Sequence, residues 1–129
     1  MNRIIFALLL SATLGITAIA QPTHSITDPE KKYKAAKEFF TQEQYAFAYP
    51  LVKELRNEYP AGQASNHSYL NDDIEYFYLA CRLRLLEEAA APDAAYYINT
   101  VTNDPRVQLL SFHLAHYYFL KDEIRTSAT

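Results

Sequence analysis

Glycine is scarce in this chain, and its scarcity narrows the folds that the chain can adopt. Only two of the 129 residues are glycines, and only Gly62 lies beyond the first twenty residues. A β-sandwich or β-barrel of this length usually needs many glycine-containing turns, whereas helices keep glycine out of their interiors. The chain is therefore expected to be all-α.

Start and stop signals divide the chain into five expected helices. Asp28-Pro29 and Asp104-Pro105 each place an N-cap aspartate before a first-turn proline, which predicts the starts of the first and fifth helices. The third helix should begin with Asn71 as its cap, and the fourth at Pro92. The second helix, from about Gln44, has an apolar stripe at spacings of three and four: Tyr45, Ala48, Val52, Leu55 and Tyr59.

Two prolines affect the predicted course of the second helix. Two segments outside the helices are predicted to be irregular. Pro60 with Gly62 ends this helix, whereas Pro50 lies inside it and predicts a local kink or a later effective start. Residues 62–70 are polar and are expected to form a loop. Residues 125–129 lose the apolar pattern and are expected to form a disordered tail.

The first twenty residues indicate export. Met1 to Arg3 form a short basic region, an apolar stretch follows, and the stretch ends at Ala20 in an Ala-x-Ala pattern typical of signal peptidase sites. The alternative is an N-terminal membrane anchor, but the small residues favour cleavage after Ala20. We therefore expect a periplasmic or secreted protein that starts at Gln21, is not inserted in the membrane, and has residues 21–28 as a linker.

The net charge limits the classes of partner that the protein can bind, and the cysteine content predicts an unreactive thiol. The 109 residues from Gln21 keep eleven of the twelve lysines and arginines and all fifteen acids, which leaves a net charge of −4. This mild acidity does not favour binding to nucleic acid or to an anionic membrane. Cys81 is the only cysteine and lies in an apolar run, so we expect a buried, unreactive thiol.

Residues 29–62 resemble a tetratricopeptide repeat, a 34-residue helix–turn–helix unit that ends on a proline. Ala36 and Ala48 match the small residues where the two helices cross, and Pro60 matches the terminal proline. Lys32 departs from the family because it occupies the position that usually holds tryptophan. Ala36 itself replaces the usual glycine.

Two looser units follow, over residues 71–104 and 105–124. Ala36, Ala80 and Ala115 are equivalent in this register and lie 44 and 35 residues apart. The whole chain resembles the N-terminal part of secreted, multi-repeat tetratricopeptide proteins of the Bacteroidetes type. The resemblance implies a short right-handed α-solenoid of about two and a half units, and an ordinary helical bundle is the alternative.

The last expected helix, from Val107 to Leu120, is apolar and lacks the second helix of its unit. Stacked repeats bury their faces only against neighbours, so a terminal unit normally carries a polar cap. We therefore expect either a truncated product or the N-terminal piece of a longer array, or self-association through this helix.

No catalytic or metal site is expected. His113 and His116 are three residues apart, a spacing that suits one metal, but no third ligand is evident nearby and the spacing is not that of a metalloprotease helix. The acids at Asp72, Asp73 and Glu75 are explained by the positive end of a helix. We expect no enzyme activity and no cofactor; a metal-dependent enzyme is the weakest alternative.

The resemblance implies a binding groove, because the first helix of each repeat in this family lines a concave surface. The positions carried over by register are Tyr33, Lys37, Phe40, Phe77, Arg84, Phe112, His116 and Phe119. Aromatic residues at helical spacing are also typical of a core. The resulting hypothesis is an exported scaffold that binds a protein or peptide partner. The alternative is a carbohydrate-binding helical protein that presents Tyr33 and Phe77 to sugars.

Overall fold

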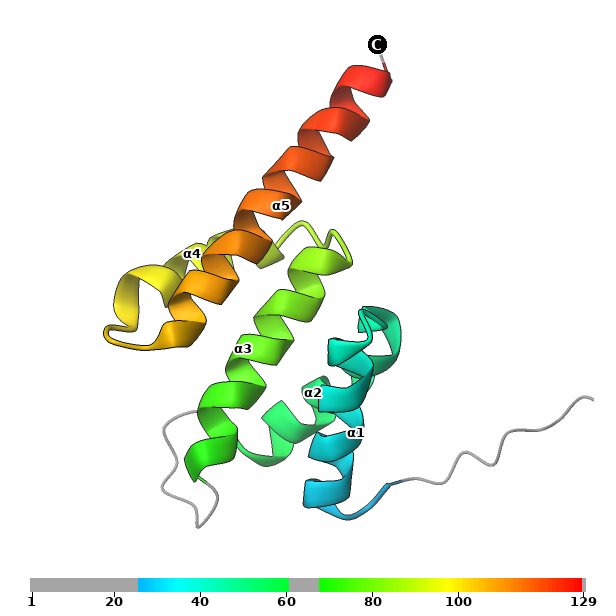
Figure 1. Cartoon of the computed structure of the whole chain (residues 1–129), viewed down its shortest axis with the longest axis vertical. Coiled ribbons are helices and arrows are strands. Elements are labelled where there is room, and N and C mark those ends of the chain that lie inside the picture. Colours follow the sequence, from blue (N-terminus) through cyan, green and yellow to red (C-terminus); the bar gives the residue numbers. More distant parts are fainter. Residues whose placement is uncertain (1–25, 61–67, 129) are drawn as a thin grey trace, which may run out of the picture.

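The computed structural model describes residues 26–60 and 68–128, and these residues form five α-helices and no strand (Figure 1). Their bounds are α1 Pro29–Thr41, α2 Tyr45–Glu58, α3 Ser68–Arg84, α4 Ala90–Thr100 and α5 Pro105–Ser127. The all-α prediction is confirmed. Within the described ranges, no helix is both long enough and apolar enough to cross a membrane. The predicted signal peptide and most of the loop at 62–70 lie outside the described residues.

Both Asp-Pro signals act as helix starts. The Asp28 carboxylate accepts a hydrogen bond from the Glu30 N–H at 3.0 Å, and the Asp104 carboxylate accepts one from the Arg106 N–H at 2.9 Å. Proline follows each cap, in a position where the helix needs no N–H donor. These two predictions are confirmed, and α1 and α5 open in the same way.

α1 and α3 also close in the same way. The Gln44 N–H donates to the Phe39 carbonyl at 2.8 Å, and the Glu87 N–H donates to the Arg82 carbonyl at 3.0 Å. The residue before each of these donors is left-handed, with φ of 59° at Glu43 and 58° at Leu86. This six-residue closing bond over a left-handed residue is a Schellman motif, which satisfies carbonyls at the helix end.

α2 matches its predicted stripe and runs without interruption through Pro50. Val52 and Leu55 are buried, whereas Pro50 and Ala46 are exposed. Proline removes the hydrogen bond to the Ala46 carbonyl, but water can reach that carbonyl on the solvent side. The helix therefore neither breaks nor restarts at Pro50.

Three predicted boundaries are wrong. α3 begins at Ser68, so Asn71 lies inside the helix rather than capping it, and α4 begins at Ala90, two residues before Pro92. α5 continues to Ser127, so residues 125–127 are helical rather than a disordered tail. No proline or glycine follows Pro105 in the sequence, and the helix therefore meets no residue that would stop it.

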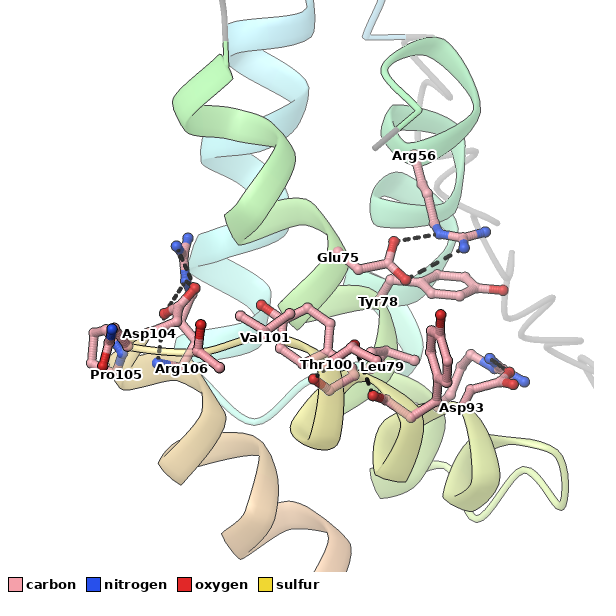
Figure 2. Close-up of a pocket in the computed structure, with 15 residues that line it drawn as sticks. Arg56, Glu75, Tyr78, Leu79, Asp93, Thr100, Val101, Asp104, Pro105 and Arg106 are labelled. Carbon is pink, nitrogen blue, oxygen red and sulfur yellow. Dashed lines mark hydrogen bonds and ion pairs between the residues drawn. The ribbon is translucent and has the colours of Figure 1, made fainter. Parts of the chain in front are cut away.

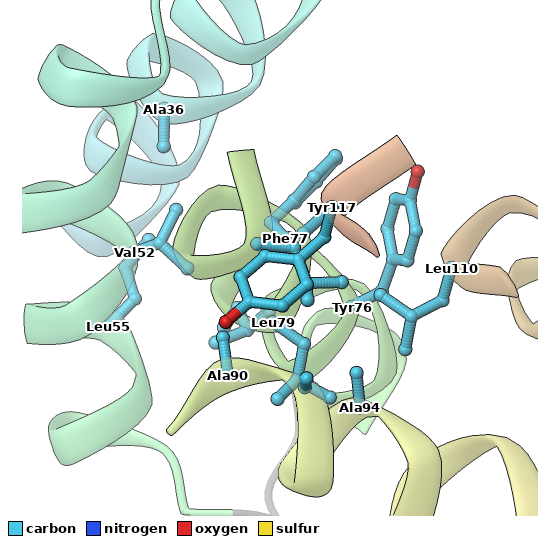
Figure 3. Close-up of a cluster of buried hydrophobic side chains, with 14 residues drawn as sticks. Ala36, Val52, Leu55, Tyr76, Phe77, Leu79, Ala90, Ala94, Leu110 and Tyr117 are labelled. Carbon is cyan, nitrogen blue, oxygen red and sulfur yellow. The ribbon is translucent and has the colours of Figure 1, made fainter. Parts of the chain in front are cut away.

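α3 is the centre of the packing. It packs against α2, α4 and α5 and more lightly against α1, and α4 also packs on α5. Figure 3 shows the resulting core, where Val52 and Leu55 of α2 approach the side chains of α3 and where Leu110 and Tyr117 reach in from α5. Alanines at the crossings let the helices come close; the fully buried ones are Ala36, Ala48, Ala80, Ala90 and Ala94.

Cys81 belongs to this core. Its side chain is fully buried, and burial raises the pKa of the thiol to about 12. The thiolate is the reactive form of cysteine, so a thiol with this pKa is inert at neutral pH. The prediction of a buried cysteine is confirmed.

Lys32 is buried, which the sequence reasoning did not predict. Its ammonium lies 2.8 Å from a Glu58 oxygen and 3.2 Å from a Glu54 oxygen, both on α2. The hydrogen bond to Glu58 is the main reason that the pKa of Lys32 is raised. The apolar stem of the lysine is thus buried between α1 and α2, and its charge lies at the rim of this contact beside the two glutamates.

We expect Lys32→Met to leave the free energy of unfolding within about 1 kcal/mol of the wild type, because an apolar side chain of similar length often replaces an ion pair at little cost. Lys32→Ala should lose about 2 kcal/mol, since it removes three buried methylenes. Urea denaturation of both variants at pH 7 measures the difference. Equal losses in the two variants would show that the charge, and not the stem, stabilises this contact.

Candidate binding surfaces

The groove residues predicted on α1 and α3 pack against one another. The Phe40 and Phe77 ring centroids are 4.6 Å apart, and those of Tyr33 and Phe77 are 6.2 Å apart. Phe77 is only 8% exposed, and the Tyr33 hydroxyl donates to an Asp73 carboxylate at 2.5 Å. The three rings therefore join α1 to α3, and Phe77 is too buried to offer a free ring face to a sugar.

The two predicted cations differ in their surroundings. Lys37 is exposed, whereas the guanidinium of Arg84 lies 5.0 Å from the Tyr45 ring centroid and 3.8 Å from a Glu43 oxygen. The Arg84 side chain is 16% exposed. It fastens the end of α3 to the turn between α1 and α2, which is a structural role.

The predicted residues on α5 lie on an exposed apolar stripe. Phe112 is 67% exposed and Phe119 is 59% exposed, and Leu109 precedes them at 54%. With the half-buried His116 these residues follow helical spacings of three and four, so they share one side of α5. We call Leu109, Phe112, His116 and Phe119 the α5 stripe.

The α5 stripe has a counterpart on α1. If Ala115 is aligned with Ala36, then Phe112 corresponds to Tyr33 and Phe119 corresponds to Phe40. On α1 both aromatic residues pack against Phe77 of α3. On α5 the equivalent residues are exposed, and in the part of the chain that the structure describes no helix covers them.

His113 lies beneath this stripe and is held by α3. Its Nε2 is 3.2 Å from the Tyr76 hydroxyl, and the rings of Phe40 and Phe112 stand at 6.0 and 6.1 Å. The Nδ1 atom is buried without a hydrogen-bond partner among the described residues. Burial, followed by the nearby Arg84 and His116, lowers the pKa of His113 to about 4.

The environment of His113 does not suit a metal shared with His116. One imidazole nitrogen contacts Tyr76 and the other is enclosed. Among residues 26–60 and 68–128, no group of three or more histidines, cysteines or acids is arranged to hold a metal ion.

The structure also contains a cavity that the sequence reasoning missed. It has a volume of about 830 Å³ and lies between α3 and α4, with walls from α2 and from the α4–α5 connection (Figure 2). We call it the α3–α4 pocket. Its lining comprises Arg56, Glu75, Tyr78, Leu79, Arg82, Asp93, Tyr96, Tyr97 and residues 100–106.

Each arginine of the pocket is paired with at least one acid. The Arg56 Nε is 2.7 Å from Glu75, and an Arg82 nitrogen is 2.6 Å from Asp93. Arg82 further pairs with Glu87 at 3.1 Å.

Arg106 closes the other side of the pocket. It pairs with Asp73 at 2.7 Å and with Asp104 at 2.8 Å. Hydrogen bonds from Arg106 lower the pKa of Asp104, so this carboxylate is charged at neutral pH. These pairs join α3 to the start of α5.

Tyrosine rings supply the apolar part of the pocket. The guanidinium of Arg56 lies 4.4 Å from the centroid of the Tyr78 ring, and that of Arg82 lies 5.2 Å from it. Tyr96 is 73% exposed, the highest value among the large apolar side chains of the described residues. The adjacent tyrosines Tyr96 and Tyr97 are the one signal in the sequence that could have indicated this site, because the lining residues come from four separate segments.

Comparisons with known proteins return no match. No family model, curated protein or solved structure is significantly similar to this chain. The resemblance to tetratricopeptide repeats therefore rests on the residues quoted above.

Proposed function

We propose that this protein is an exported, non-catalytic scaffold of tetratricopeptide-like repeats that binds a partner protein through the α5 stripe. The observation that carries the proposal is the exposure of Phe112 and Phe119, whose equivalents Tyr33 and Phe40 are packed between helices. Large exposed apolar patches on a folded protein mark interaction sites.

The repeat organisation has independent support. Ala36 and Ala80 are both buried at helix crossings, and α1 and α3 both end in a Schellman motif. Each helix packs on the next, and alternate helices pack as α1 on α3 and α3 on α5. These features favour a short right-handed α-solenoid over an irregular bundle.

The partner should present an amphipathic helix. Leu110, Tyr117 and Ile124 follow one another at seven-residue intervals along one side of α5. Their exposed fractions are 0%, 6% and 53%, so this side is buried along the first part of the helix and exposed at its end. Figure 1 shows the reason: α5 extends past the end of α3, which leaves its last turns uncovered. A helical surface offers ridges and grooves to another helix, and it offers no strand edge for β-augmentation.

Export is supported by the basic start, the apolar stretch and the Ala-x-Ala pattern that ends at Ala20. The mature protein would begin at Gln21. Mass spectrometry of the exported protein should then give an N-terminal peptide that starts at this residue.

Site-specific photo-crosslinking tests the proposed surface. A photoreactive phenylalanine analogue at position 119 should give an adduct with one defined protein in cells that export the chain. The matched control has the analogue at Phe47, which is 63% exposed on α2 and lies outside the stripe. An adduct of the chain with itself would identify the partner as a second copy.

A double variant provides the second arm of this experiment. Phe112→Ser with Phe119→Ser should reduce adduct formation from a probe at Leu109, which is 54% exposed on the stripe, at least about tenfold, which corresponds to 1.4 kcal/mol of lost affinity. The free energy of unfolding should change by no more than about 0.5 kcal/mol, because both rings are exposed. Adducts of equal yield at positions 47 and 119, or an unaffected double variant, would refute the proposal.

A further inference from the structure

The α3–α4 pocket shares no residue with the α5 stripe, and its chemistry points to a different kind of ligand. We infer that this pocket binds an uncharged saccharide. The proposal rests on the charge balance of the pocket, its mixture of hydrogen-bond donors and acceptors, and its exposed tyrosine. It is independent of the proposed protein-binding function.

The charges around the pocket disfavour anionic ligands. The three guanidiniums of Arg56, Arg82 and Arg106 face three lining carboxylates, and Asp73 and Glu87 add two more just outside the lining. An anion entering the pocket would meet these carboxylates, because every arginine is already paired. The carboxylates outnumber the guanidiniums by two, and both surplus acids, Asp73 and Glu87, lie outside the lining. The charges therefore disfavour an anion, and the hydrogen-bonding groups described next favour a neutral ligand over a cation.

The hydrogen-bonding groups suit hydroxyls. Guanidiniums only donate and ionised carboxylates only accept, whereas each hydroxyl of a sugar does both. The side chain of Asp93 is 54% exposed although it is paired with Arg82, so it keeps acceptor capacity towards a ligand. The lining contains both kinds of group, so a ligand with many hydroxyls can bond to donors and acceptors at once.

Tyr96 offers an apolar surface beside these polar groups. A pyranose ring has a face of C–H bonds that packs on an aromatic ring while its hydroxyls point outward. Tyrosine also provides such contact area at a small cost in conformational entropy, because it has only two side-chain torsions. The high exposure of Tyr96 leaves its ring accessible at the pocket.

The size of the cavity agrees with this ligand class. A volume of about 830 Å³ lies within the range of small-molecule sites, which runs from about 300 to 1,000 Å³. Arg82 and Arg106, at 6% and 23% side-chain exposure, hold their ion pairs in place, so much of the wall is preformed.

Titration of the purified protein with soluble tetrasaccharides tests the inference. The probes are maltotetraose, cellotetraose and chitotetraose, with tetragalacturonate as the anionic comparison, and the readouts are amide chemical shifts and calorimetry. At least one neutral probe should bind at millimolar concentration and shift amides of α4. The chain has no tryptophan, so tyrosine fluorescence gives a third readout.

The matched variants are Tyr96→Ala in the pocket and Tyr118→Ala on α5, where Tyr118 is 56% exposed. Tyr96→Ala should weaken binding about tenfold, and Tyr118→Ala should leave it unchanged. The inference is overturned if no neutral probe binds, if tetragalacturonate binds more tightly than every neutral probe, or if both variants behave alike. The Phe112→Ser, Phe119→Ser double variant should bind the saccharide normally, so failure of one proposal leaves the other standing.

Discussion

Replacing Leu110 by alanine should lower the free energy of unfolding by about 3 kcal/mol, the cost of a cavity left by a buried leucine. Leu110 is fully buried and, with Tyr117, is one of the two residues of α5 that enter the common core (Figure 3). Urea denaturation of the purified protein, followed by far-ultraviolet circular dichroism, measures the loss. The expected result is a lower midpoint with an unchanged slope.

The neighbouring residue provides the control. Leu109 has the same side chain but is 54% exposed on the α5 stripe, so Leu109→Ala should change stability by no more than about 0.5 kcal/mol. The pair differs only in which side of the helix loses the same atoms. Similar losses at both positions would mean that α5 packs through a different face, and the stripe would then not be an exposed surface.

Stability should fall as the pH is lowered from 6.5 to 4, and His113 should cause most of the fall. The pKa of His113 is about 4 in the folded protein, against 6.5 for an unperturbed histidine. Between these two values the unfolded chain binds a proton that the folded chain does not, so acid favours unfolding. The full loss is at most about 3 kcal/mol, since each pKa unit corresponds to 1.36 kcal/mol.

The physical cause of this pH dependence is the enclosure of the imidazole. Protonation would place a charge and an extra N–H where Nδ1 has no acceptor among the described residues, close to Arg84 and His116. Stability from His113 should be complete above about pH 6.5, the upper end of the window. Below about pH 4, His113 causes no further loss of stability. Further loss there comes from acids such as Asp104, whose pKa is lowered in the folded protein.

His113→Gln isolates the contribution of this residue. Glutamine does not titrate and is able to keep a hydrogen bond with the Tyr76 hydroxyl. The difference in unfolding free energy between pH 7 and pH 4.5 should be smaller by about 2 kcal/mol in the variant than in the wild type. If both proteins lose the same stability over this interval, His113 is not the group responsible.

Much of the fold was predictable because its signals are local. The Asp-Pro caps act on N–H groups two residues away, and the stripe of α2 places Val52 and Leu55 on one side whatever surrounds the helix. The predicted end of α5 is wrong because the loss of an apolar pattern does not by itself end a helix. A helix without an interior proline or glycine can continue as an exposed helix, as residues 125–127 do.

The candidate sites were less predictable, because exposure depends on what lies opposite a residue. Lysine is mostly an exposed residue, yet two glutamates of α2 pair with the charge of Lys32 while its stem is buried. The α3–α4 pocket draws residues from α2, α3, α4 and the start of α5, and no short stretch contains its pattern.

The sequence alone determined that the chain is helical, where most of its helices start, and which residues of α2 face inward. These properties depend on interactions within one or two helical turns. Tertiary structure decided which aromatic residues are core and which are surface. Phe40 and Phe119 are equivalent only in the proposed repeat register; α3 covers Phe40, and no described helix covers Phe119. Burial is a property of pairs of helices, so it was decided only when the helices packed.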